Sequence, residues 1–392
     1  MSQPVTSAAS PGVYVHLPFC ASRCSYCDFL SGFDPAAMPK YVDAVLREAE
    51  LTQKQPNPWK NALFDTLYLG GGTPSFLGAT LLVKLVEGLR GRLGLTEDCE
   101  HTVECNPSDI HQDLLNALAK SGINRISLGV QSFVDSELAI LSRRHDAQGA
   151  HHALKLIGQH DASFLLNVDL IHAIPGQNLE SLNFSLCQAL DHKPNHLSCY
   201  ALTLSQESPL AKRLALQNRP DLTNFKEEFY PVDEDSQLKH YTFIEKHLES
   251  AGFEHYEISN YAKEEYRSRH NQKYWKRVPV LALGSGAYGF DGKNRYENTD
   301  DLNVYLESVD KNRLPVKQFE QLNAEQVRLE EIALGLRTSD GFHSSCLSAS
   351  EKTEKILQKL AKENLLLKNK TGQLRPTSQG MLMADAIALR LA

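Results

Sequence analysis

The sequence predicts an α/β fold, built as a partial or full (β/α) barrel and followed by a smaller, mainly helical C-terminal part. Between residue 13 and about residue 205, short β-rich runs alternate with longer segments of helical periodicity. This alternation is typical of βα units around a parallel sheet. From about residue 314 the chain changes to Glu- and Lys-rich helical segments. An open doubly wound sheet is the competing arrangement for the first part.

Six strands are expected, each a short run of apolar and β-branched residues. They span residues 13–17, 65–69, 102–104, 125–128, 164–171 and 196–200. Helical periodicity predicts helices over residues 40–52, 81–93, 109–120, 177–190 and 241–251.

Capping residues support several of these helix ends. Asp34, before Pro35, precedes the first helix, and Ser108 or Asp109 precedes the third. Their side-chain oxygens can accept hydrogen bonds from free backbone N–H groups. Gly252 follows the last helix and can take the left-handed conformation that ends a helix.

Changes in composition suggest four parts. Residues 1–11 are expected to be a flexible N-terminus, and residues 12–235 a barrel core that ends in a polar stretch with three prolines over 206–235. Residues 236–313 would extend the barrel. Residues 314–392 would form a C-terminal domain, with helices over 323–336 and 351–363 and apolar turns up to residue 368. This last part looks like a winged-helix-like module.

Charge and hydropathy exclude some classes of protein. Against 41 Lys and Arg stand 48 Asp and Glu, which gives a formal net charge of −7. A nucleic-acid partner is therefore not expected, because phosphate binding usually needs a net basic face. There is no apolar run of about 18 residues that could span a bilayer, and no signal-peptide pattern at the N-terminus. A cytoplasmic protein without a transmembrane segment is expected.

Three of the eight cysteines lie close together, in the loop after the first expected strand. Cys20, Cys24 and Cys27 are spaced x3 and then x2, and soft thiolates suit the iron of an iron-sulfur cluster. A structural zinc site would need a fourth ligand, which His16 could supply, and chance packing cysteines are a further alternative. Three thiolates on a [4Fe-4S] cluster would leave one iron open for a substrate or cofactor.

Polar or glycine residues also follow the other expected strands, where barrel proteins place their active sites. Gly70 to Pro74 follow the second strand, Glu104 ends the third, Asp169 lies in the fifth and Ala201 follows the sixth. Glycines let a backbone approach a ligand closely, and the two carboxylates could hold ribose hydroxyls or an amino group. A plain turn, a helix cap or a surface charge would explain each residue on its own.

The CxxxCxYC loop resembles that of the radical S-adenosylmethionine superfamily. The resemblance implies a barrel of that type, a [4Fe-4S] cluster on the three cysteines, S-adenosylmethionine on the open iron, an electron donor for the cluster, and radical chemistry. The glycine stretch would contact the methionyl amino group. The implied cofactor contacts are Tyr14, Tyr26, Gly71, Gly72, Thr73, Glu104, Gln131, Arg143, Asp169, Ala201 and Tyr288.

Nearly the whole chain is similar to the oxygen-independent coproporphyrinogen oxidase group, including residues 129–133, 169–171 and 175–177. Decarboxylating oxidases of that group carry a further cysteine two positions after the third. This chain has Phe29 at that position. The departure puts porphyrinogen decarboxylation in doubt.

Residues 269–275 resemble the HNxxYW motif of the heme chaperones within that group. On a helix His270 and Tyr274 would share a face, and both are axial ligand types for heme iron. Trp275 could cover a porphyrin edge. Without the resemblance, a packed aromatic helix end with a hydrogen-bonded histidine would be the ordinary interpretation.

The resemblance therefore implies a heme chaperone. Such a protein would bind heme and pass it to an apo-hemoprotein, for example a respiratory enzyme, while cluster and cofactor regulate the process or transfer electrons. The alternative is a radical enzyme that acts on a porphyrin. Phe29 and the segment from His270 to Trp275 favour the chaperone, and no catalytic residue is assigned.

Overall fold

A computed structural model describes residues 9–28, 30, 34–54, 57–217 and 231–392. Three sequence predictions fall partly or wholly outside these residues. They concern residues 1–8 of the expected N-terminal segment, Phe29, and residues 218–230 of the proline-containing stretch.

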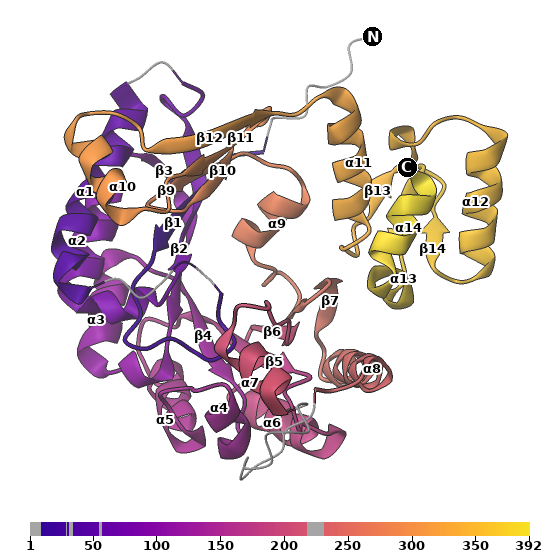
Figure 1. Cartoon of the computed structure of the whole chain (residues 1–392), viewed down its shortest axis with the longest axis horizontal. Coiled ribbons are helices and arrows are strands. Elements are labelled where there is room, and N and C mark those ends of the chain that lie inside the picture. The colour runs from indigo at the N-terminus through magenta and orange to yellow at the C-terminus, as the bar shows by residue number, and fades with distance from the viewer. Residues whose placement is uncertain (1–8, 29, 31–33, 55–56, 218–230) are drawn as a thin grey trace.

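The centre of the fold is a parallel sheet formed by the six predicted strands, which are thereby confirmed (Figure 1). They lie side by side in chain order and all run in the same direction. Their bounds are β1 Gly12–Leu17, β2 Leu63–Gly71, β3 Gly94–Cys105, β4 Arg125–Gln131, β5 Leu165–His172 and β6 His196–Ala201.

Further strands extend this sheet at both edges. β9 (Val280–Leu283) pairs parallel with β1, and three antiparallel strands follow it, namely β10 (Tyr288–Phe290), β11 (Asn294–Asn298) and β12 (Val316–Gln321). At the other edge β8 (Asn260–Ala262) and β7 (Glu254–Glu257) follow β6. The outermost strands β12 and β7 do not pair with each other within the described chain. Over the described residues the sheet thus forms a partial barrel.

Helices follow the parallel strands in turn and cover the outer face of the sheet (Figure 1). They are α1 Met38–Lys54, α2 Gly78–Arg90, α3 Gln112–Ser121, α4 Asp135–Ile140, α5 Ala147–Gly158 and α6 Leu179–Asp191. Then come α7 Pro209–Gln217, α8 Glu234–Ser250, α9 Arg269–Trp275 and α10 Leu302–Asp310. Short 3-10 turns are η1 Pro35–Ala37, η2 Pro74–Leu77 and η3 Pro107–Asp109. None of the described helices is long and apolar enough to cross a membrane.

The helix caps agree with the sequence prediction in two of three places. Asp34 accepts a hydrogen bond from the N–H of Ala36 and caps η1 directly before α1, and Gly252 has φ +83°. The predicted cap of the third helix is wrong. His111, not Ser108 or Asp109, caps α3, because residues 107–109 are used in turn η3.

The parallel strands separate apolar from polar side chains by their two-residue period. Alternate residues such as Val13, Leu67, Val103 and Ile126 are fully buried against the helices and form the main core. The residues between them point to the concave side of the sheet and are mostly polar. The concave side is therefore built to hold a ligand rather than to be filled by a core.

The C-terminal part has a small core of its own, which includes Ile332, Leu336, Leu360 and Leu374. Its elements are α11 Ala324–Gly335, β13 Phe342–His343, η4 Ser344–Cys346, α12 Glu351–Lys362, β14 Leu366–Lys368, β15 Gln373–Pro376, α13 Ser378–Leu382 and α14 Ala384–Leu391. The strands form an antiparallel sheet in the order β13-β15-β14. Residues 366–368, expected to be a turn, thus form a strand. The domain boundaries given above stay a prediction.

Candidate ligand-binding site

A cavity of about 540 Å³ runs along the concave side of the sheet. One end lies at the carboxyl ends of the strands, beside the cysteine loop, where Gln131 and Ala201 line it. The other end reaches Arg125 and His196, the first residues of β4 and β6, and Asn271 of α9. A concave site with many convergent polar groups is the expected form of a small-molecule site.

The cavity brings together twelve of the residues that the sequence predicted. They are Cys20, Cys24, Tyr26, Cys27, Gly71, Gly72, Thr73, Glu104, Gln131, Arg143, Asp169 and Ala201. Two predicted contacts, Tyr14 and Tyr288, are not among the residues that line it. The hydroxyl of Tyr14 is hydrogen-bonded to Nδ1 of His16, at 3.0 Å. Tyr288, on β10, is 66% exposed.

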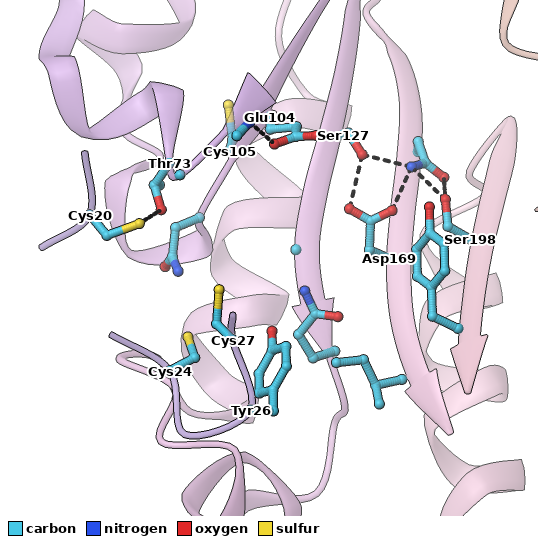
Figure 2. Close-up of a pocket in the computed structure, with 18 of the residues that line it drawn as sticks. Cys20, Cys24, Tyr26, Cys27, Thr73, Glu104, Cys105, Ser127, Asp169 and Ser198 are labelled. Carbon is cyan, nitrogen blue, oxygen red and sulfur yellow. Dashed lines mark hydrogen bonds between the residues drawn. The ribbon is translucent and has the colours of Figure 1, made fainter. Parts of the chain in front are cut away.

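Figure 2 shows the three cysteines on one loop that faces the cavity. Sγ of Cys20 lies 3.3 Å from the hydroxyl of Thr73, and Nη1 of Arg143 donates to Sγ of Cys24 at 3.3 Å. No three His, Cys, Asp or Glu side chains of the described chain are grouped closely enough to hold a metal ion. The residues fit an iron-sulfur cluster by donor chemistry, because they are three partly exposed thiols on the wall of one cavity.

The glycine stretch holds the base of the cysteine loop. The N–H groups of Gly72 and Thr73 donate to the carbonyls of Leu17 and Phe19, at 3.0 and 2.8 Å. A Cβ atom on Gly72 would lie 2.7 Å from the carbonyl oxygen of Phe19. The N–H groups are therefore engaged within the protein. Glycine is needed here because the two segments pass so close.

Two partly buried carboxylates, Glu104 and Asp169, face the cavity without forming an ion pair with any described residue. Glu104 accepts hydrogen bonds from the hydroxyl of Tyr68, at 2.8 Å, and from the N–H of Gly71, at 3.2 Å. Burial raises the pKa of Glu104 to about 7, and burial also raises the pKa of Asp169. A cationic ligand would stabilise both carboxylates. The amino and sulfonium groups of S-adenosylmethionine have that charge.

Asp169 lies at the centre of a hydrogen-bonded row across three strands (Figure 2). Its oxygens accept from the hydroxyl of Ser127, at 2.9 Å, and from the amide of Asn167, at 2.7 Å. The same amide donates to Ser198 at 3.0 Å. This row fixes the rotamer of Asp169 toward the cavity.

Sequence reasoning missed the polar residues deeper in the cavity. They are Thr102, Arg125, Ser127, Asn167, His196, Ser198, Ser268 and Asn271. A signal for most of them was present, because β3 to β6 each carry a polar residue at every second position, as in Thr102 and Glu104.

α9, which carries the HNxxYW motif, lies across the concave side of the sheet (Figure 1). Its first turn is bound to β3, since the N–H groups of Arg269 and His270 donate to the carboxylate of Glu100 at 3.2 and 3.0 Å. Arg269 and Lys273 also pair with Asp65, at the start of β2. The helix is thus fixed to the strand ends opposite the cysteine loop.

The three residues predicted to contact heme differ in exposure. His270 is 1% exposed, with Nδ1 at 2.8 Å from the hydroxyl of Thr66 and Nε2 at 3.1 Å from the hydroxyl of Tyr274. Burial and the charge of Lys273 lower the pKa of His270 to about 3. Tyr274 is 44% exposed, and Trp275 is half-buried. Of the three, Tyr274 has the most exposed side chain, although burial and the charge of Glu104 raise the pKa of its phenol above the usual value.

Comparison with known proteins supports a family assignment. The sequence model of the Radical SAM superfamily matches residues 14–185. A heme chaperone HemW from Mycobacterium tuberculosis strain H37Rv is 32% identical over 386 residues, which are 97% of this chain and 94% of that one. HemW from Synechocystis is 35% identical over 87% of this chain and 81% of its own. HemW from Escherichia coli K12 is 36% identical over 71% of this chain and 69% of its own.

Among solved structures, coproporphyrinogen III oxidase (HemN) from Escherichia coli, a radical SAM enzyme, superposes with a TM-score of 0.80. The match covers 98% of this chain and 90% of that one, at 21% identity. At this identity the likeness shows the fold, an α/β radical SAM fold with a large, mostly parallel sheet.

Proposed function

Because the chain belongs to the HemW family of heme chaperones, we propose that it binds heme and transfers it to an apo-hemoprotein. The observation that carries the proposal is the geometry of α9, where the partly exposed Tyr274 is hydrogen-bonded to the buried His270. The acceptor would be a hemoprotein of the same cell, such as a respiratory enzyme. We place this activity in the cytoplasm, where clustered thiols are kept reduced and available to a metal.

Tyr274 is the proposed iron ligand, and His270 is its support. The hydroxyl of Thr66 can either donate to or accept from Nδ1 of His270. The neutral ring can therefore present Nε2 as an acceptor to the phenol or as a donor to the phenolate of Tyr274. A tyrosinate is an established axial ligand of heme iron. Trp275, next in the helix, would cover part of the porphyrin.

Cys20, Cys24 and Cys27 are the proposed ligands of a [4Fe-4S] cluster, which, with S-adenosylmethionine bound, supplies electron-transfer or radical chemistry when an electron donor reduces it. Arg143 places a positive charge beside the sulfur of Cys24 and would balance thiolate charge there. Glu104 and Asp169 would attract the cationic groups of the cofactor.

The test uses anaerobically purified protein that contains the cluster. Ferric heme is titrated into the wild type, Tyr274→Phe, and the control Tyr266→Phe, in which a nearby half-buried tyrosine is changed. We expect stable heme absorption in the wild type and control, and about tenfold weaker binding in Tyr274→Phe. The heme-loaded protein is then mixed with an apo-hemoprotein, and the acceptor's spectrum reports transfer.

A parallel sample receives coproporphyrinogen III, S-adenosylmethionine and a reductant. Formation of protoporphyrinogen IX would contradict the proposal and assign the chain to the oxidases. Absence of heme binding by the wild type would contradict it as well.

A further inference from the structure

The short helix α9 is held by two separate parts of the molecule. It has only seven residues, whereas an isolated helix needs roughly 12–15 residues to be even marginally stable in water. Its position therefore depends on contacts with its surroundings. The sheet holds its first turn through Glu100 and Asp65. Further contacts come from the C-terminal part of the chain, which α11 to α14 form.

One carboxylate of the C-terminal part binds side chains at both ends of α9. Asp340 lies between α11 and β13. Its Oδ1 accepts a hydrogen bond from Nη1 of Arg267, at 3.0 Å, and its Oδ2 lies 3.0 Å from Nζ of Lys276. Arg267 directly precedes Ser268, the N-cap of the helix, and Lys276 is the C-cap. The two oxygens of a single side chain thus connect the two ends of α9.

Other contacts dock the C-terminal part beside Asp340. Nε of Arg277, the residue after α9 and its C-cap, donates to Glu330 of α11 at 2.7 Å, and these two side chains are 12% and 17% exposed. The N–H of Ser339 donates to the carbonyl of Tyr256 on β7, at 3.0 Å. The docking therefore does not depend on Asp340 alone, and a variant at this position is expected to keep the overall fold.

Asp340 has a fixed position within the C-terminal part. Its carbonyl accepts a hydrogen bond from Nε2 of Gln373 on β15, at 2.8 Å. The next residue, Gly341, has φ +69°, and a Cβ atom there would collide with the carbonyl oxygen of Leu374. The turn passes so close to β15 that only glycine fits. The carboxylate is thus presented from a rigid base, as a group that orients another element requires.

We propose that Asp340 is a positioning residue of the heme site, through which the C-terminal part holds the last turn of α9 with Tyr274 and Trp275. The inference rests on the proposed function. The side chains of Asp340, Arg267 and Lys276 are 39%, 23% and 51% exposed. Ion pairs with this exposure are individually weak and are screened by salt. Loss of the pairs therefore loosens the last turn, and heme bound there leaves faster.

The first measurement needs no heme. Hydrogen exchange is followed in cluster-containing wild type, in Asp340→Asn and in the control Asp385→Asn. Asp385 is an exposed aspartate of α14 that pairs with Arg337 in the same part of the chain. Amides at the end of α9, over residues 273–277, should exchange about fivefold faster in Asp340→Asn, the scale of one or two partly exposed ion pairs. The control should match the wild type, and all three should contain equal iron and sulfide.

The second measurement is the rate of heme release. Each heme-loaded protein is mixed with a large excess of apomyoglobin, which captures released heme, and absorption follows the transfer. Asp340→Asn should release heme about fivefold faster than the wild type and the control at low salt. At about 1 M salt this difference should disappear, because the ion pairs are screened in all three proteins. A general loss of packing in the variant would leave a difference at both salt concentrations.

Two variants of the partner residue test the same contact from the other side. Lys276→Gln should behave like Asp340→Asn, and Lys276→Arg, which keeps the charge, should behave like the wild type. Equal hydrogen exchange of α9 in Asp340→Asn and the wild type would overturn the proposal, as would faster exchange with an unchanged rate of heme release. Absence of heme binding by the wild type would contradict the proposed function, whereas hydrogen exchange would still decide whether Asp340 positions α9.

Discussion

The ring of His270 and the phenol of Tyr274 are hydrogen-bonded across one turn of α9, with Nε2 and the hydroxyl 3.1 Å apart. The other ring nitrogen, Nδ1, is hydrogen-bonded to the hydroxyl of Thr66, so neither ring nitrogen of His270 is available to bind iron. The two residues therefore have different roles although they share a helix face. His270 orients the phenol, and Tyr274 has the more exposed side chain of the two.

His270→Ala should lower the free energy of unfolding by about 2–4 kcal/mol, because it leaves a buried cavity and an unpaired hydroxyl on Thr66. Urea denaturation measures the change. His152→Ala, an exposed histidine of α5, is the control and should change stability by less than about 0.5 kcal/mol. Unchanged stability of His270→Ala together with complete loss of heme binding would instead identify His270 as the iron ligand.

Cys24→Ser should remove most of the iron and sulfide, because serine oxygen is a poor ligand for an iron-sulfur cluster. Metal and sulfide analysis of the anaerobically reconstituted protein gives the answer. Cys187→Ser is the matched control, since this cysteine lies on α6, away from the cavity. Equal iron content in Cys24→Ser and wild type would exclude Cys24 as a ligand.

Glu104→Gln should weaken the binding of S-adenosylmethionine about tenfold, because it removes a negative charge from the cavity. The carboxyl pKa of about 7 adds a pH dependence. Only the ionised form attracts a cation, so wild-type affinity should rise as pH increases through 7, and this rise should shrink in the variant. Calorimetry at pH 6 and pH 8 tests this. Glu48→Gln serves as control, because Glu48 has the same raised pKa but does not line the cavity.

Glu48 itself should make stability depend on pH. It is buried between α1, β11 and α10, where it accepts from the N–H of Gly284, the amide of Asn298 and the hydroxyl of Tyr305. Burial raises its pKa from 4.5 to about 7. The folded state thus binds a proton that the unfolded state releases between these values, so stability falls as pH rises from about 4.5 to 7.

Glu48→Gln removes this titration. Relative to wild type, the variant should gain stability between pH 5 and pH 8, by up to about 3 kcal/mol. Urea denaturation at the two pH values measures the difference. A difference that stays constant with pH would mean that Glu48 does not titrate in this window.

The parallel sheet could be predicted from the sequence, because each strand is a short apolar run and the segments between the strands show helical periodicity. It was not sufficient for β9, whose four residues become a strand only by pairing with β1, more than 260 positions earlier. The cap of α3 was wrong for a local reason, since turn η3 uses the expected capping residues.

For the candidate site, strand-end positions were predictable, because parallel strands bring their carboxyl ends together. The deeper residues Thr102 and Arg125 were missed, although alternation of polar residues along β3 and β4 indicated them. The burial of His270 was not predictable. It depends on the docking of α9 against Glu100 and Asp65, which are distant in sequence.

The position of α9 has a thermodynamic consequence. Asn271 faces the cavity that the cysteine loop closes at its other end, and Tyr274 lies one turn further on the same seven-residue helix. If a ligand in the cavity shifts this helix at Asn271, Tyr274 moves with it, and a ligand on Tyr274 would likewise displace Asn271. Linkage then requires reciprocity: if S-adenosylmethionine changes the affinity for heme, heme changes the affinity for S-adenosylmethionine by the same factor.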